Sequence, residues 1–128
     1  MDPMRRLRAF LNRCLGDRGE LAAARYLKKL GWRILARGVR VRHGEIDLIA
    51  VDDRTLVYVE VKTRRRGCPA EAVTLEKQRR LTRAARRFAH KHRLQNHPGR
   101  FDVIAITWPD DNQPPDIKHY RNAFEAYD

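Results

Sequence analysis

The sequence predicts an α/β fold in which a mixed sheet carries helices on both faces. Three observations predict it: an early segment with helical periodicity, a central run of β-branched strands, and a long amphipathic helix before a further strand. The strand at 56–62 is mostly apolar on both faces, as is typical of a sheet that helices cover on both sides. The connection from this strand through the long helix to the next predicts a parallel, right-handed crossover.

Length and composition favour one domain and exclude several protein classes. The 128 residues suit a single core, predicted over 17–124, with a basic amphipathic segment at 1–16 and a tail at 125–128. No apolar stretch approaches the roughly 20 residues that span a bilayer, and the start lacks the apolar region of a secretory signal. Two isolated cysteines exclude a disulfide framework or a zinc cluster. We therefore expect a cytoplasmic protein without a membrane partner.

The first element is a helix predicted over 17–30, because apolar residues recur at helical spacing and Gly31 suits the position after its last turn. Glu20 is a carboxylate on the otherwise apolar stripe of this helix. Asp17 and Glu20 also match a capping box. Glu20 therefore has either a capping role or a role in a site.

The remaining elements follow in order: strands over 32–37, 45–51 and 56–62, a helix over 74–91, a strand over 101–108 and a short edge strand over 117–120. A two-residue loop at Asp53 and Arg54 joins the second and third strands as a hairpin. The long helix places Lys77 and Gln78 on its inward face and a row of arginines on the other.

Charge is distributed unevenly along the chain. The net charge of +12 points to a polyanionic partner, nucleic acid first and an anionic membrane surface second. Residues 1–42 carry a net +9 and residues 62–93 a net +10, whereas residues 43–61 between them carry −4. An acidic island thus lies between two strongly basic blocks.

The acidic island predicts a metal site. If the hairpin loop pairs residue 52 with 55, Asp47 faces Glu60 across the two strands, and Lys62 lies on the same side as Glu60. Opposed carboxylates on a half-buried face need a positive charge between them, and oxygen ligands suit Mg²⁺ or Mn²⁺. Such a site supports phosphodiester hydrolysis, with Lys62 stabilising the developing charge. A register shift of one residue would remove this argument.

Simpler interpretations exist for the same residues. Lys62 could form an ordinary cross-strand pair with Glu45, which the same register places opposite it. Arg64, Arg65 and Arg66 follow the motif directly, so they either contact phosphate or form a solvated loop. The arginine face of the long helix is either a nucleic-acid contact or a soluble exterior.

A family resemblance rests on these residues. Gly44-Glu45-Ile46-Asp47, then Glu60-Val61-Lys62, with Glu20 on the preceding helix, resembles the active-site pattern of the PD-(D/E)xK nuclease superfamily. More closely, the chain is identified as a member of the YraN family of small bacterial proteins, which is similar to archaeal Holliday-junction resolvases. The similarity runs from about Gly19 to Phe124 and includes RHGEIDLIAVD, VYVEVKTR and RFDVIAI.

The resemblance implies a restriction-endonuclease-like core and a role for each matching residue. It implies Asp47 and Glu60 as metal ligands, the Val61 carbonyl as a third ligand, Lys62 as the catalytic lysine and Glu20 as a helix-borne acid. Lys77 and Gln78 match a region where relatives contact substrate or carry accessory catalytic residues. Ile46 stands where the superfamily pattern has proline, which supplies no ligand.

These observations together favour a Mg²⁺-dependent, structure-selective DNA endonuclease that acts on branched or recombination intermediates. A resolvase makes two symmetric cuts, so that activity would imply a homodimer. The alternative is a nucleic-acid-binding module that keeps the nuclease fold without turnover. A third possibility, a membrane-surface protein, rests on the basic N-terminal segment alone.

Overall fold

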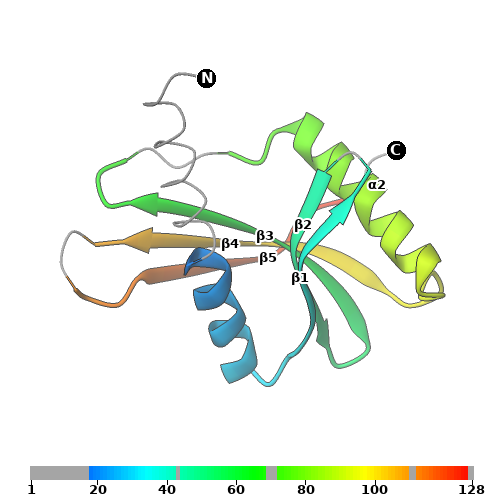
Figure 1. Ribbon diagram of the computed structural model, residues 1–128, viewed down its shortest axis with the longest axis horizontal. Helices are drawn as coiled ribbons and strands as arrows, with labels where there is room; N and C mark the ends of the chain where they lie inside the picture. Colours follow the sequence, from blue (N-terminus) through cyan, green and yellow to red (C-terminus); the bar gives the residue numbers. More distant parts are fainter. Residues whose placement is uncertain (1–17, 43, 69–71, 110–111, 127–128) are drawn as a thin grey trace.

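The computed structural model describes residues 18–42, 44–68, 72–109 and 112–126 (Figure 1). Its elements in chain order are a first helix over residues 18–29, β1 (Arg33–Val41), β2 (Gly44–Asp52), β3 (Thr55–Arg65), α2 (Leu75–Lys91), β4 (Gly99–Trp108) and β5 (Asp116–Phe124). The five strands form one sheet in sequence order, in which β3 and β4 are parallel and the other pairs antiparallel. The predicted α/β class, the mixed sheet and the parallel pairing of the two strands on either side of α2 are confirmed. The predicted N-terminal segment lies outside the described residues.

Alternate residues of β3 face two separate cores. Val57 and Val59 pack in the core that the first helix covers, whereas Leu56 and Tyr58 pack in the core under α2. The predicted coverage of both faces is therefore confirmed. The helices contribute mostly small side chains to these cores: Ala23, Ala24 and Leu27 from the first helix, and Leu81, Ala84 and Ala85 from α2. Within the described ranges, no helix is long and apolar enough to cross a membrane.

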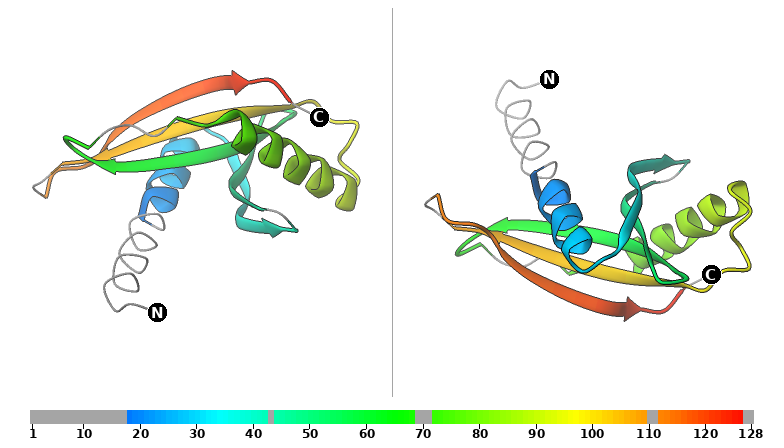
Figure 2. Two further views of the ribbon diagram at one scale, coloured as in Figure 1. Left: turned by 90° about the horizontal axis from the view of Figure 1, so that it is seen from above. Right: turned by 90° about the horizontal axis from the view of Figure 1, so that it is seen from below.

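Two outer strands are longer than their sequence patterns predict. The sequence pattern predicts that β1 ends at residue 37. The strand continues to Val41, because Gly38 adopts a positive φ of 57° and a bulge between Ile34 and Ala36 adjusts the register. β5 continues to Phe124, whose ring stacks on Phe101 at 4.8 Å between centroids. The outer ends of β1 and β2 project out of the plane of β3, β4 and β5 (Figure 2).

β3 also extends beyond its predicted end at residue 62, and this changes the interpretation of the arginines. Arg64 pairs with Thr107 and Arg65 with Trp108 in the parallel ladder to β4. The loop interpretation is therefore wrong for these two residues, because the neighbouring β4 satisfies their backbone groups. Arg66 follows directly, and its N–H donates to the Trp108 carbonyl.

α2 begins as predicted. Thr74 caps it, with its hydroxyl accepting a hydrogen bond from the Lys77 N–H at 3.2 Å. Lys77 and Gln78 are half-buried on the inward side of α2. The helix lies beside the start of β2 (Figure 1), and Gly44 and Lys77 line the same cavity.

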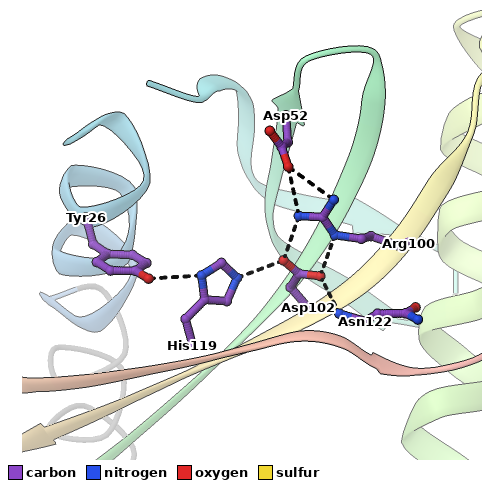
Figure 3. Close-up of polar contacts among 6 residues, drawn as sticks. All are labelled: Tyr26, Asp52, Arg100, Asp102, His119 and Asn122. Atoms are coloured by element: carbon purple, nitrogen blue, oxygen red, sulfur yellow. Dashed lines mark hydrogen bonds and ion pairs between the residues drawn. The ribbon is translucent and has the colours of Figure 1, made fainter. Parts of the chain in front are cut away.

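A buried carboxylate ties β4 to β5. The Asp102 side chain is fully buried, and its Oδ1 accepts hydrogen bonds from Arg100 Nε at 3.0 Å and from the Asn122 N–H at 2.9 Å (Figure 3). His119 Nε2 lies 2.7 Å from the other oxygen. Asn122 has a positive φ of 50°, and the register shifts beside it, which turns its N–H toward Asp102. Every oxygen of this carboxylate therefore has a partner.

The same network reaches the first helix and the hairpin turn. Tyr26 on the first helix places its hydroxyl 3.0 Å from His119 Nδ1, and Arg100 donates to Asp52 at 3.2 Å (Figure 3). Four parts of the chain that are distant in sequence are thus held together by polar contacts. The network fixes the first helix on the sheet, and this helix carries Glu20.

Close packing at Gly19 positions the other end of the first helix. A Cβ atom at this position would lie 2.0 Å from Thr63 Cγ2 on β3. We expect Gly19→Ala to destabilise the protein by about 1–3 kcal/mol, because overpacking outweighs the better helix propensity of alanine. Thermal unfolding measures the change. Adding Thr63→Ala removes the clashing methyl group and should restore much of the loss, and a single variant as stable as the wild type would contradict this close contact.

Candidate functional site

The ladder between β2 and β3 opens at Asp47. Backbone pairing runs from Asp52 opposite Thr55 to Leu48 opposite Val59, which is the register predicted from the two-residue turn. At the next position a side chain replaces the backbone pairing, because Asp47 Oδ2 accepts a hydrogen bond from the Val61 N–H at 2.8 Å. A carboxylate thus replaces a backbone acceptor, and the two strands separate around it.

Val61 contributes its backbone to this opening. The N–H and C=O of one residue in a strand point to the same edge. Because the Val61 N–H points to Asp47, the Val61 carbonyl faces the same gap. This is the position that the resemblance implies for a backbone ligand.

Glu60 is a buried carboxylate between two lysines. Its side chain is only 3% exposed, with Lys77 Nζ at 2.8 Å and Lys62 Nζ at 3.6 Å from Oε1. Burial alone would lower the pKa of Lys77, but the hydrogen bond and charge of Glu60 outweigh it and raise that pKa above its usual value. Lys62 lies on the side of β3 predicted from its spacing to Glu60.

Asp47 is held in its protonated form by its surroundings. Burial raises its pKa, and the nearby charge of Glu60 raises it further, to about 8. The hydrogen bond from the Val61 N–H favours the ionised form and opposes this shift. Asp47 and Glu60 therefore behave as the closely spaced carboxylates that the hairpin register predicts.

A second group of carboxylates meets at Asp47. Oxygen atoms of Glu20, Glu45 and Asp47 all lie within 4.8 Å of one another. Mg²⁺ binds oxygen at about 2.0–2.1 Å, so oxygens on opposite sides of one ion are about 4.2 Å apart. Small side-chain adjustments would let this acidic group hold one divalent cation, and its all-oxygen donor set suits Mg²⁺ or Mn²⁺.

Glu45 is the site residue that the sequence argument missed. The strand register predicts Glu45 as a cross-strand partner of Lys62, whereas the structure places Glu45 with Glu20 and Asp47 and pairs Lys62 with Glu60. The signal was available, because residues two apart in a strand share a face and Glu45 precedes Asp47 by two. Glu20 reaches the group from the first helix, and its proposed capping partner Asp17 lies outside the described residues.

One cavity joins two members of the acidic group to Glu60. This cavity of about 270 Å³ is lined by Glu45, Asp47, Glu60, Lys77 and neighbouring residues. Asp47 belongs to the acidic group and also adjoins Glu60, which its two lysines contact. The structure brings together all the residues for which the resemblance implies metal ligation or catalysis: Glu20, Asp47, Glu60, Val61 and Lys62.

The residues predicted to contact nucleic acid lie in three different places. Lys77 is engaged with Glu60 inside the site. Gln78 donates to the Val73 carbonyl at 3.0 Å and lines a second, larger cavity together with Arg64 and Arg66. Arg65 is exposed at the end of β3, and strand alternation turns it away from its two neighbours.

The raised pKa of Asp47 predicts how the stability of the metal-free protein depends on pH. The folded protein binds this proton more tightly than the unfolded chain, whose aspartate has a pKa near 3.8. The free energy of unfolding should therefore fall as pH rises from about 4 to about 8.

Asp47→Asn should remove this dependence, because asparagine keeps an oxygen acceptor for Val61 without the charge. We expect the variant to unfold at a higher temperature than the wild type at pH 8.5, by more than at pH 5, in the presence of EDTA. Equal differences at the two pH values would contradict the raised pKa.

Comparison with known proteins identifies the family. The family model described as "Uncharacterised protein family UPF0102" matches residues 19–106. A UPF0102 protein of Geobacter sulfurreducens is 49% identical over 119 residues, which cover 89% of this chain and 91% of the relative. UPF0102 proteins of Geotalea daltonii and Caldicellulosiruptor saccharolyticus are 47% and 44% identical over 89% and 86% of this chain, and over 91% and 96% of their own lengths. The chain therefore belongs to the UPF0102 (YraN) family, as its motifs predict.

Proposed function

We propose that this protein is a Mg²⁺- or Mn²⁺-dependent nuclease that hydrolyses phosphodiester bonds in DNA, with branched or recombination intermediates as substrates. One observation carries the proposal. Asp47 occupies the opening between β2 and β3, where it adjoins both the acidic group and the buried Glu60 with its lysines. This arrangement combines oxygen ligands for a cation with an ammonium group at the same place.

The residues have separate roles in this proposal. Asp47, Glu60, the Val61 carbonyl and Glu20 would hold the cation, with Glu45 as a further oxygen donor beside them. When bound, the cation supplies Lewis-acid polarisation of the phosphate and makes water more acidic. Lys62, at 18% exposure and 3.6 Å from Glu60, would orient the attacking water or stabilise charge on the phosphate.

The charge of the chain supports a nucleic-acid substrate. Lysines and arginines outnumber acids by 28 to 16, while the acids at the site would be offset by the cation. The two basic segments of the sequence, residues 1–42 and 62–93, would attract the phosphate backbone and position it over the site.

The test is cleavage of a panel of labelled substrates by the full-length protein. Four-way junctions, flaps, single strands and duplexes are incubated with Mg²⁺ or Mn²⁺, and with EDTA as the control. We expect cleavage that needs the metal, is strongest on branched DNA and is lost in Asp47→Asn. Absence of cleavage on every substrate with both metals would overturn the proposal.

A second candidate function is a nucleic-acid-binding module without turnover. It is favoured by the two ammonium groups on Glu60, which compensate its charge without a metal. This candidate predicts binding whose affinity falls steeply as the salt concentration rises and that neither EDTA nor Asp47→Asn affects.

The nuclease proposal has a further consequence for the oligomeric state. Sedimentation of the protein with and without a four-way junction tests the homodimer that two symmetric cuts would need.

A further inference from the structure

The face of the sheet that carries α2 is only half covered by it. The helix packs over Leu56 and Tyr58, but the same face continues along β3 through Lys62 and Arg64 to Arg66, which directly follows the strand. Above it lies a cavity of about 790 Å³, bordered by β3, β4, β5 and the start of α2. Lys62 lines this groove, so the groove begins at the candidate active site.

Strand register shows which residues of β5 lie across from the site. Three rows cross the sheet on this face: Glu60, Val103 and Tyr120; Lys62, Ala105 and Lys118; and Arg64, Thr107 and Asp116. Neighbouring strands are about 4.8 Å apart. The backbone of Tyr120 and Lys118 is therefore about 10 Å from that of Glu60 and Lys62, across a floor of smaller side chains.

The border of the groove is positively charged. Arg64 donates to the Thr107 hydroxyl at 3.1 Å and to the Cys68 carbonyl at 3.0 Å, which fixes its guanidinium group without neutralising the charge. Lys118 stands exposed on the opposite border. Among the described residues of this lining, Asp116 is the single carboxylate, and it pairs with Arg66 at 3.8 Å.

Tyr120 adds an aromatic surface to this basic groove. Its side chain is 51% exposed, on the groove side of β5, whereas the alternate residues Ile117 and His119 turn toward the first helix. An exposed tyrosine beside positive charges matches the features by which proteins bind single strands, where bases stack on aromatic rings. Paired bases in a duplex are stacked on each other, so a duplex cannot use such a ring.

We propose that this groove binds a single-stranded nucleic-acid segment beside the bond to be cut, with a base stacked on Tyr120 and phosphates contacted by Lys118 and Arg64. The inference rests on the proposed nuclease function and specifies its substrate. A substrate with a single-stranded arm would place that arm in the groove, while the junction of the arm with the duplex would lie at Lys62.

The test measures binding rather than cleavage, so that it is separate from the test of nuclease activity. The full-length protein is titrated into fluorescently labelled oligothymidylate, or into a labelled duplex of equal length, with EDTA present. We expect Tyr120→Ala to weaken single-strand binding about 5- to 100-fold and to change duplex binding little. Tyr120→Phe should bind like the wild type, and Lys118→Ala should reduce the salt dependence by about one charge.

Controls keep the outcome clear. Tyr120→Leu removes the ring but keeps an apolar strand residue, so it tests stacking even if the alanine variant folds poorly. Leu35→Ala changes another exposed apolar residue, 42% exposed on β1, and should leave binding unchanged. If both Tyr120 variants without a ring bind the single strand as tightly as the wild type, or lose duplex binding equally, the groove proposal is wrong even if the protein cleaves DNA.

Discussion

Lys62→Ala is expected to reduce the rate of metal-dependent cleavage by about 10²- to 10³-fold, the loss typical of removing one group that stabilises transition-state charge. The fold should survive, because Lys77 remains 2.8 Å from Glu60 and still compensates the buried carboxylate. Single-turnover rates at saturating protein report the chemical step, so a weaker affinity for the substrate would not be mistaken for slower chemistry.

Lys28→Ala is the matched control for Lys62. Lys28 is an exposed lysine on the first helix, so its loss changes the net charge equally without touching the site. This variant should cleave like the wild type. A Lys62→Ala protein that cleaves at the rate of the Lys28→Ala protein would remove Lys62 from the mechanism and weaken the assignment of this site as catalytic.

Arg100→Met is expected to lower the free energy of unfolding by about 3–5 kcal/mol, because it leaves the buried Asp102 carboxylate without its guanidinium partner. Arg100 is 20% exposed and bonded to both Asp102 and Asp52, and its guanidinium carbon lies 5.1 Å from the centre of the Trp32 ring. Methionine preserves much of the apolar packing, so the expected loss is mainly electrostatic. Urea or thermal unfolding measures it.

A double variant separates the network from simple loss of packing. Adding Asp102→Asn to Arg100→Met removes the uncompensated charge, so the pair should cost less than the sum of the two single changes. The control is Arg80→Met, which breaks the exposed pair with Glu76 and should cost about 0.5 kcal/mol or less. Additive effects in the double variant would show that Arg100 and Asp102 do not act as a pair.

The hairpin of β2 and β3 shows how far local sequence determines this fold. A two-residue turn fixes the pairing of Asp52 with Thr55, and strand alternation then carries Asp47 toward Glu60 without any tertiary information. The helical spacing of α2 likewise places Lys77 on the inward face. These features depend on periodicity alone, and the structure agrees with them.

Other features depend on which segments become neighbours. β3 continues through Arg64 and Arg65 because one edge of β4 pairs with it, and β5 extends to Phe124 because it pairs with the opposite edge of β4. The charged segment at Arg64 and Arg65 gives no local signal of a strand, because its backbone partners Thr107 and Trp108 lie about 40 residues further along the chain. The bonds of Asp102 to His119 and Arg100 are equally invisible in the sequence.

The sequence by itself determined the class of the fold, the family and most of the candidate site, because the motif residues lie on two strands joined by one short turn. The tertiary structure decided the rest. It brought Glu20 from the first helix to Asp47 and Glu45, placed Lys77 on Glu60, and set Lys118 and Tyr120 across the sheet from Lys62 and Glu60. These contacts join segments that are distant in the sequence. Packing and strand pairing determine them, whereas local periodicity carries no information about which distant segments meet.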